Sequence, residues 1–448
     1  MGRLFGTNGV RGVFGEDLTL EVVHDLTMSI SRHLGEGRVL VGRDGRHSSQ
    51  AISDMVCATL NYAGRDCADA GLVPTPCLEY CVRVMGCAGG IMVTASHNPP
   101  QYNGIKPVAA DGVEVSRDDE AAIEQHYINK DAPAPPRFGT TVTEGAAVRT
   151  YLNGILSHVD ADAIRQEGYT VALDMGNGTQ AVTAPLLCQM LDCRIVPVYD
   201  TIDGDFPGRG SEPTPDNLAD LSAAVQESGA DLGIAFDGDG DRSLICDENG
   251  DVLTGDKSAL LLARHILERS QGARVVTCLN SGLAIDELAA RYGSAVIRTR
   301  VGSVEVSRRM VECGAMVGFE ENGGFMYGPH NQVRDGLMTL ALALGALGSS
   351  GLTVSEMAQT LPDSHTAKTK VRCTPSQAET LVAELARAHP GADTTDGVRI
   401  KLGERRWVMV RPSGTEPIVR IYAEAPSQTE LDSTLSEYGA IAREIIKS

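Results

Sequence analysis

The chain has 448 residues, which is too long for one hydrophobic core, so we expect about three or four domains. A hydrophobic share of 42%, an aromatic share of 4% and 49 glycines favour an α/β protein with many tight turns over an all-β sandwich. The net charge of −20 argues against nucleic acid as a partner, because nucleic acid binding requires a basic face.

The sequence shows no sign of a membrane segment or of a disulfide framework. Its start has no apolar stretch long enough for a signal peptide. The most apolar stretch, 337–347, predicts a buried helix that is too short to span a bilayer. The eleven cysteines show no paired C-x-x-C spacing. We therefore expect a cytoplasmic protein with reduced thiols and no membrane partner.

Three segments of the chain share one pattern, in which an apolar run ends in polar and glycine residues and a helical pattern follows. These segments begin at Arg38, Thr170 and Arg274. Such alternation predicts parallel strands with crossover helices, whose polar groups collect at the carboxyl ends of the strands. The repeat at spacings on the order of a hundred residues suggests three related α/β domains.

The end of the chain follows a different pattern. A strand near 368–373, a helix over 375–389, strands around Val398 and Trp407 and a final helix predict a small α+β domain. A proline-rich connector, 131–136, closes the first domain. We therefore expect the four domains to cover 1–145, 146–255, 256–364 and 365–448.

The segment 94–99 reads T-A-S-H-N-P and follows a short apolar run that predicts a buried strand. The two consecutive prolines after it exclude a helix, so Ser96 lies on a rigid turn at a strand end. His97 and Lys106 supply an imidazole and an ammonium near this hydroxyl. A hydroxyl in such company can accept and return a group that needs charge stabilisation. The alternative is a surface turn rich in Ser and Asn.

The segment D-G-D-G-D-R places Asp237, Asp239 and Asp241 between two apolar runs. Oxygen ligands of this kind suit Mg²⁺ or Ca²⁺ rather than zinc, and without a cation the carboxylates would raise one another's pKa. An EF-hand is excluded by Arg242, which occupies the position of its invariant glycine. The alternatives are a solvated acidic turn, or a phosphatase of the haloacid-dehalogenase type in which Asp237 is the nucleophile.

The segment F-E-E-N-G-G follows a further apolar strand and contains Glu320 and Asn322. A carboxylate and an amide at this place could hold sugar hydroxyls, whose recognition needs paired donors and acceptors. A plain hairpin turn is the alternative. Near the start of the chain, Arg11 lies among turn-forming residues, where the alternative is a simple surface loop.

The segment R-P-S-G-T-E-P, 411–417, follows the apolar strand around Trp407. Its small residues allow backbone N–H groups to converge on an anion, and a hydroxyl with a guanidinium completes a phosphate cradle. Arg420 would add positive charge. The alternative is a Pro/Gly turn between two strands.

These four motifs, in this order and one per predicted domain, resemble the α-D-phosphohexomutase superfamily over essentially the whole chain. The resemblance implies three similar α/β domains with mixed sheets, a smaller C-terminal α+β domain, and an active site in a central cleft. It implies one Mg²⁺ per chain and a phosphoserine at Ser96. The implied catalytic residues are Ser96, His97, Lys106 and Arg11; the implied substrate contacts are Glu320, Asn322, Arg411, Ser413, Gly414, Thr415 and Arg420; the implied metal ligands are Ser96, Asp237, Asp239 and Asp241.

The sugar-binding segment departs from the pattern of many members, which carry G-E-x-S-G-H. This chain has Asn322 in place of the serine and Gly324 in place of the histidine, so the role of that histidine is not carried over. The E-E-N-G-G form is similar to archaeal members. The opening 4–12 is closest to phosphoglucosamine mutases.

The resemblance implies interconversion of glucosamine 6-phosphate and glucosamine 1-phosphate, through a phosphoserine enzyme and a bound 1,6-bisphosphate. Phosphomannomutase/phosphoglucomutase activity is the alternative within the superfamily. Outside it, the alternatives are the phosphatase described above and a non-catalytic phosphosugar-binding protein. A homodimer is compatible with the sequence, which does not determine the oligomeric state.

Overall fold

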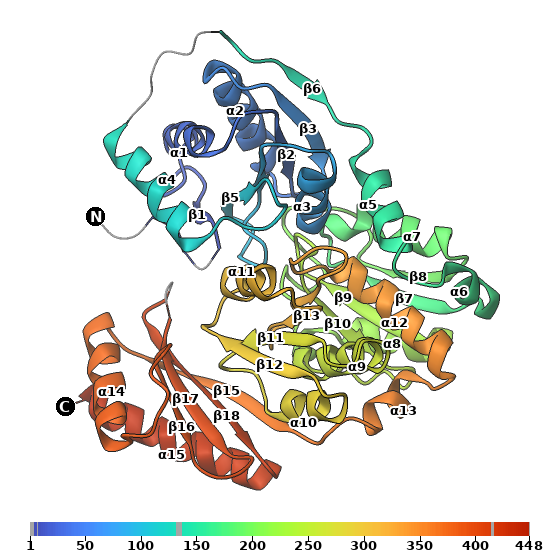
Figure 1. The fold of residues 1–448 in the computed structure, drawn as a ribbon, viewed down its shortest axis with the longest axis vertical. Coiled ribbons are helices and arrows are strands. Elements are labelled where there is room, and N and C mark those ends of the chain that lie inside the picture. Colours follow the sequence, from blue (N-terminus) through green and yellow to red (C-terminus); the bar gives the residue numbers. More distant parts are fainter. Residues whose placement is uncertain (1–3, 7, 131–136, 414–415, 448) are drawn as a thin grey trace.

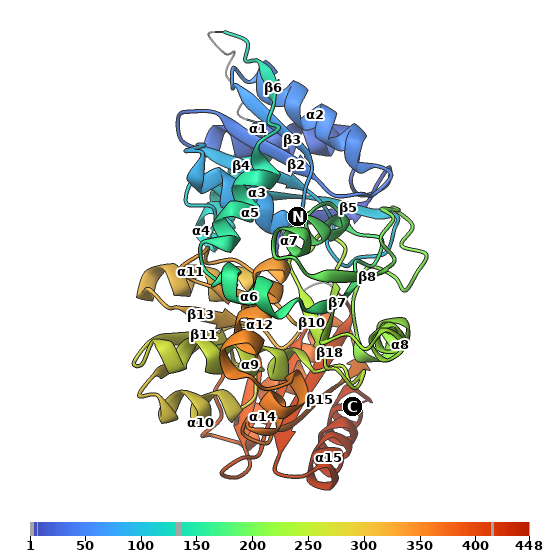
Figure 2. The same cartoon turned by 90° about the vertical axis from the view of Figure 1, so that its right-hand side faces the viewer.

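The computed structural model describes residues 4–6, 8–130, 137–413 and 416–447. The described strands form four sheets, and we number the domains 1 to 4 after these sheets in chain order. Domain 1 lies at one end of the long axis and domain 4 at the other, with domains 2 and 3 between them (Figures 1 and 2).

Domain 1 is built on a six-stranded sheet in the order β1-β5-β4-β2-β3-β6. Strands β2, β3, β4 and β6 run parallel, whereas β5 pairs antiparallel with both β4 and β1. The strands are β1 (Val10–Val13), β2 (Val39–Arg43), β3 (Cys67–Leu72), β4 (Gly89–Val93), β5 (Tyr102–Ala109) and β6 (Thr141–Thr143). The helices are α1 (Leu20–His33), α2 (Ser49–Tyr62), α3 (Thr75–Val84) and α4 (Arg117–Asn129).

Domain 2 has a four-stranded sheet in the order β10-β9-β7-β8. Its strands are β7 (Thr170–Asp174), β8 (Arg194–Val198), β9 (Leu232–Phe236) and β10 (Ser243–Cys246). Its helices are α5 (Ala147–Leu156), α6 (Ala161–Glu167), α7 (Ala184–Met190) and α8 (Ala219–Ser228), with 3₁₀ turns η1 (Thr179–Val182) and η2 (Pro215–Asn217). The helix predicted after the first strand of this domain begins at Ala184, because Pro185 suits the first turn of a helix.

Domain 3 has a four-stranded sheet in the order β12-β11-β13-β14. Its strands are β11 (Arg274–Cys278), β12 (Ala295–Thr299), β13 (Val317–Phe319) and β14 (Phe325–Tyr327). Its helices are α9 (Gly255–Arg269), α10 (Ala284–Arg291), α11 (Ser303–Cys313), α12 (Gly336–Ser350) and α13 (Val354–Gln359).

The sheets of domains 1, 2 and 3 share one four-stranded unit, which confirms the prediction of three similar domains with mixed sheets. In each unit three parallel strands, joined through helices, are followed by a fourth strand that pairs antiparallel with the third. The units are β3-β2-β4-β5, β8-β7-β9-β10 and β12-β11-β13-β14. The connection from the third strand to the fourth therefore occupies the same topological place in all three domains.

Domain 4 differs, as predicted, and has an antiparallel sheet in the order β15-β18-β17-β16. Helices α14 and α15 cover one face of this sheet. Strand β18 was not predicted from the sequence. The strands are β15 (His365–Arg372), β16 (Val398–Lys401), β17 (Trp407–Pro412) and β18 (Ile418–Ala425), and the helices are α14 (Pro375–Ala388) and α15 (Gln428–Lys447).

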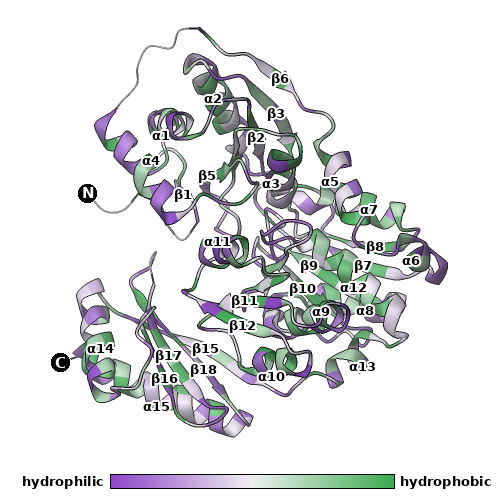
Figure 3. Ribbon diagram, in the orientation of Figure 1, coloured by the Kyte–Doolittle hydropathy of each residue, from purple (hydrophilic) through white to green (hydrophobic). Residues whose placement is uncertain are grey.

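One continuous hydrophobic core joins domains 1, 2 and 3. It includes Val82 of α3, Val171 of β7 and Val275 of β11. The predicted apolar helix is α12, which packs against α5, α6 and α9, and Figure 3 shows this region as strongly hydrophobic. Because the core crosses the boundaries, the loops of these three domains are held in fixed relative positions.

The cysteines and the lengths of the helices bear on disulfides and on membrane spans. All eleven cysteines are free thiols. Within the described ranges, every helix is too short or too polar to cross a bilayer.

Candidate active site

The tips of three equivalent hairpins meet where domains 1, 2 and 3 join. The Ser96 loop connects β4 to β5, the aspartate loop connects β9 to β10, and the Glu320 loop connects β13 to β14. Ser96 Oγ donates to Asp237 Oδ2 at 2.9 Å, which joins the first two tips. Ser243 N donates to Gly323 O at 3.0 Å, which joins the second tip to the third. The structure therefore brings predicted residues from three domains together.

Ser96 is buried and adopts a left-handed backbone conformation with φ of 51°. This conformation costs a non-glycine residue about 1–3 kcal/mol and persists only where the surroundings enforce it. The Ser96 N–H donates to Thr94 Oγ1 at 2.9 Å, which supports the turn from inside. The strained backbone aims the hydroxyl at Asp237 instead of at solvent.

Arg46 stabilises the Ser96 loop by hydrogen bonds to its carbonyl groups. Sequence reasoning did not single out this residue. Its side chain is fully buried, and its Nε donates to Asp44 Oδ2 at 3.0 Å. Its two terminal nitrogens donate to the carbonyls of Ser96 (2.7 Å), Asn98 (2.6 Å), Pro99 (2.7 Å) and Tyr102 (2.9 Å). One guanidinium thus orders most of the loop. The available signal was the D-G-R sequence at the carboxyl end of β2, directly beside β4.

The three aspartates of the second tip form a buried cluster whose candidate ligand atoms all lie within 4.8 Å of one another. Burial and the carboxylates of Asp241 and Asp239 raise the pKa of Asp237 to about 7. Burial also opposes ionisation of Asp239, but Lys106 and Thr75 outweigh it and hold the pKa of Asp239 below its usual range. The predicted mutual rise in pKa therefore applies to Asp237 and is wrong for Asp239.

The aspartate cluster fits a divalent cation. Asp239 Oδ1 and Asp241 Oδ1 are buried and have no hydrogen-bond partner in the described part of the chain. Unsatisfied buried carboxylate oxygens are costly, and a cation among them removes that cost. Because the donor set consists of oxygen alone, it suits Mg²⁺ better than a transition metal.

Two predicted cations lie beside the Ser96 loop and the aspartate cluster: Lys106 and Arg11. Lys106 Nζ is 3.3 Å from Asp239 Oδ2 and 3.2 Å from Asp241 Oδ2. Burial disfavours its charge, but these carboxylates prevail and raise the pKa of Lys106 above its usual range. Arg11 Nη1 donates to Asn98 Oδ1 at 2.7 Å, and burial lowers the pKa of Arg11 to about 10. Both side chains remain cationic at neutral pH.

His97 lies beside the serine hydroxyl, with its Nδ1 at 3.4 Å from Ser96 Oγ. Burial and the positive charges of Arg242 and Arg11 hold the pKa of His97 well below its usual range. The ring is therefore neutral at physiological pH. It can take part in hydrogen bonds to the transferred group, but it does not contribute a positive charge.

Arg334 bridges the second and third tips, and no predicted motif included it. Its guanidinium pairs with Asp241 and with Glu320 Oε2, the latter at 3.3 Å. A Cβ atom on Gly324 would lie 2.4 Å from Arg334 Cδ, so the arginine fills the space that a side chain at position 324 would need. Asp335, the next residue, caps α12 by accepting from Met338 N at 2.9 Å, which positions Arg334.

The third tip is a hairpin turn that lies at the candidate site. The hairpin turn and the sugar-binding segment, which the sequence analysis gave as alternatives, are therefore compatible. Glu320 is buried, and burial raises its pKa. Asn322 is half-buried, and its Oδ1 accepts from Gly324 N at 3.2 Å. Arg242, a further residue that was not predicted to act, donates from Nε to Asp237 Oδ2 at 3.3 Å.

The predicted phosphate loop of domain 4 makes its described contacts within its own domain. Arg411 Nε donates to Asp396 Oδ2 at 2.8 Å, and Arg420 Nη2 donates to Glu416 Oε2 at 3.0 Å. Among the residues that the structure describes, no hydrogen bond or ion pair joins Arg411 or Arg420 to Ser96 or the aspartates. Ser413 is described, whereas Gly414 and Thr415 lie outside the described residues.

Domain 4 nevertheless contacts the third tip. Lys368 of β15 forms an ion pair with Glu321 at 3.0 Å. Glu321 directly follows Glu320, so domain 4 reaches the edge of the site through this pair.

Comparison with known families identifies all four domains. Models of the phosphoglucomutase/phosphomannomutase family match residues 2–134 (alpha/beta/alpha domain I), 149–250 (domain II), 254–365 (domain III) and 369–437 (C-terminal domain).

Relatives resemble the chain along its whole length. A phosphoglucosamine/phosphogalactosamine mutase of Sulfurisphaera tokodaii is 38% identical over 98% of this chain and 98% of its own. A phosphoglucomutase/phosphomannomutase of Thermococcus kodakarensis is 37% identical over 96% of each chain. Among solved structures, a putative phosphomannomutase from Thermus thermophilus matches with a TM-score of 0.85 and 28% identity over 99% of both chains.

Proposed function

The chain belongs to the phosphoglucomutase/phosphomannomutase family, and on this basis we propose that it interconverts glucosamine 6-phosphate and glucosamine 1-phosphate. The observation that carries the proposal is the buried Ser96 hydroxyl, which donates to Asp237 in the middle of a cluster of cations. The choice of glucosamine is supported by the name of the Sulfurisphaera relative and by the opening 4–12.

The reaction that we propose consists of two phosphoryl transfers. In the first, the bond between phosphorus and Ser96 Oγ breaks as a bond to the free sugar hydroxyl forms, which yields a 1,6-bisphosphate. The bisphosphate then turns over in the site, and Ser96 Oγ takes back the other phosphoryl group. The proton that the sugar hydroxyl loses in the first transfer goes to the departing Ser96 Oγ. In the second transfer Ser96 Oγ loses a proton as it attacks, and the departing sugar oxygen gains one, so the cycle is balanced.

The described residues supply what such transfers need. Phosphoryl transfer depends mainly on positioning and on stabilising the charge of the transferred group. Four cationic side chains surround the aspartate cluster and can offset that charge: Arg11, Lys106, Arg242 and Arg334. Asp237, Asp239, Asp241 and a Ser96 oxygen would hold Mg²⁺, which when bound offsets negative charge on the phosphoryl group.

The remaining predicted residues would hold the sugar and its second phosphate. We propose that Glu320 and Asn322 contact sugar hydroxyls, because they lie at the third tip beside Arg334. We propose that the loop of Arg411 and Ser413 binds the phosphate that does not react. This role requires domain 4 to approach the other three loops, so we also propose that the domain closes over the substrate.

Selectivity among sugars tests the choice of substrate. We expect kcat/KM for glucosamine 6-phosphate to exceed that for glucose and mannose 6-phosphates by about tenfold or more, because a charged amine at C2 changes the hydrogen bonds that Glu320 can accept. The measurement is a side-by-side assay of the three sugars, with galactosamine 6-phosphate added, at saturating Mg²⁺. A higher value for mannose or glucose 6-phosphate would show that the phosphomannomutase/phosphoglucomutase alternative is correct.

A variant of Arg334 tests the contribution of the residue that bridges the second and third tips. Arg334→Met keeps most of the side-chain volume and removes the charge, so we expect kcat to fall by about 10²-fold. Arg334→Lys should recover part of the loss because it restores the charge without the planar fork. Arg309→Met, on the exposed face of α11, is the matched control and should leave kcat unchanged. A wild-type kcat for Arg334→Met would exclude this role.

A further inference from the structure

A cavity of about 540 Å³ lies between domains 3 and 4. Its volume falls in the range of sites for small organic molecules. None of its lining residues belongs to the candidate active site, so it is a separate feature. Helix α10 and the preceding residue supply one wall, and β16, β17 and their connections supply the other: Leu283, Asp286, Glu287, Gly391, Asp393, Arg399, Lys401, Glu404, Arg405, Arg406 and Trp407.

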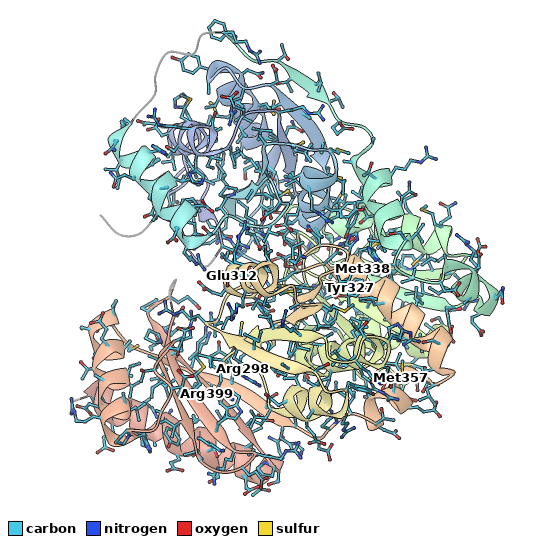
Figure 4. All side chains as sticks on the ribbon, in the orientation of Figure 1. Arg298, Glu312, Tyr327, Met338, Met357 and Arg399 are labelled. Atoms are coloured by element: carbon cyan, nitrogen blue, oxygen red, sulfur yellow. The ribbon has the colours of Figure 1, made fainter. Side chains whose placement is uncertain are left out.

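The fold of domain 4 points Arg399 toward domain 3. Val398 and Ile400, its neighbours on β16, are buried in the core beneath α14 and α15, so Arg399 projects from the opposite face of the sheet. Figure 4 shows Arg399 in domain 4 near Arg298 of β12 in domain 3. The Arg399 guanidinium lies 4.3 Å from the centroid of the Trp407 ring, which holds it by a cation–π contact.

Two donors of Arg399 are unused. Its Nε and Nη2 atoms are buried and have no hydrogen-bond partner in the described part of the chain. These two nitrogens form the side of the guanidinium that presents parallel N–H groups to two oxygens of one anion. A buried charged donor without an acceptor is unfavourable, and it is rare in folded proteins unless a ligand satisfies it. Burial lowers the pKa of Arg399 to about 10, so the group stays cationic at neutral pH.

The two acidic residues on the domain 3 wall of the cavity already have partners. Asp286 accepts from both terminal nitrogens of Arg298 at 2.8 Å. Glu287 accepts from Arg291 at 2.7 Å. Neither carboxylate accepts from Arg399 Nε or Nη2. A ligand that satisfies Arg399 therefore has to bring its own oxygens.

We propose that this cavity binds a small organic anion through a carboxylate or phosphate group that accepts from Arg399 Nε and Nη2. Trp407 would pack against the body of the ligand, and Lys401 supplies a second positive charge on the same wall. Because the cavity has walls from two domains, the bound anion would also stabilise their association.

The fluorescence of Trp407 provides a direct test, because it is the single tryptophan of the chain. We expect sodium succinate, inorganic phosphate or both to change the fluorescence saturably at constant ionic strength. Arg399→Gln should weaken binding by about tenfold or more, since two charge-assisted hydrogen bonds are lost. Arg399→Lys should also weaken it, because lysine lacks the fork. A response to succinate alone would identify a carboxylate site, and a response to phosphate alone would identify a phosphate site.

Two control variants show whether the change in fluorescence arises from binding in this cavity. Arg411→Gln changes the predicted phosphate loop, and Arg387→Gln changes the last turn of α14; both should respond as the wild type does. Loss of the response in Arg411→Gln would place the anion in the candidate active site and overturn the proposal. So would the absence of any saturable change in the wild type, or an unchanged response in Arg399→Gln.

Thermal unfolding provides a second measurement of binding, which does not depend on fluorescence. Sodium succinate should raise the thermal unfolding midpoint of the wild type and leave that of Arg399→Gln unchanged. Neither measurement depends on turnover, so the proposal can fail while the proposed function stands, and the reverse.

Discussion

Ser96→Ala is expected to lower mutase turnover by about four orders of magnitude or more, because in the proposed function Ser96 Oγ carries the phosphoryl group between the two transfers. The variant should fold normally, since alanine loses one hydrogen bond to Asp237 and meets the same backbone conformation. Turnover of glucosamine 6-phosphate is the first measurement. Mass spectrometry of the intact protein is the second, and should show one phosphoryl group on the active wild type and none on the variant.

Ser228→Ala is the matched control for this experiment. Ser228 lies in the last turn of α8, where its hydroxyl donates within its own helix, so its loss should affect neither phosphorylation nor turnover. Full activity of Ser96→Ala, or active enzyme without a phosphoserine, would contradict the proposed function. If Ser96→Ala still hydrolysed the sugar phosphate, Asp237 would be the nucleophile of a phosphatase.

Asp239→Asn is expected to raise the Mg²⁺ concentration needed for half-maximal activity and to lower kcat, each on the order of 10²-fold. An amide oxygen is a weaker ligand than a carboxylate, and the change also weakens the contacts with Lys106 and Thr75. The unfolding midpoint without Mg²⁺ should change little. Loss of the pair with Lys106 is opposed by relief of repulsion from Asp237 and Asp241.

Titration of activity with Mg²⁺, together with thermal unfolding with and without the cation, measures both effects. Asp251→Asn removes an exposed carboxylate after β10 in the same domain and should leave the titration curve unchanged. A curve for Asp239→Asn that matches the wild type would show that this carboxylate does not hold the metal.

The sequence carried enough information to predict the repeated α/β units, because each combines a buried apolar strand with a polar tip and a helix. Strand β18 was missed, although it alternates in period two. Val419, Ile421 and Ala423 enter the core of domain 4, and Tyr422 packs toward domain 3. The opposite face mixes polar Arg420 and Glu424 with apolar Ile418 and Tyr422, so the alternation is weaker than in an ordinary strand of an antiparallel sheet.

Arg46 and Arg334 could not be predicted, because their roles arise from contacts between distant parts of the chain. Arg46 binds carbonyls about fifty positions away, and Arg334 pairs with Asp241 of another domain. The only local signal for Arg46 is the D-G-R sequence after β2, and Arg334 lies in no motif. In contrast, Ser96 and the aspartates lie in short motifs whose glycines and prolines constrain the backbone locally.

The shared place of the three hairpin tips has a consequence for how substrate preference can change. Each tip grows from its own pair of strands, so residues in one tip can be exchanged or inserted without moving the stems of the other two. In the proposed function, the first two tips carry the phosphoryl chemistry and the third contacts the sugar. A chain of this design can therefore acquire a new sugar by altering one loop while its chemistry stays intact.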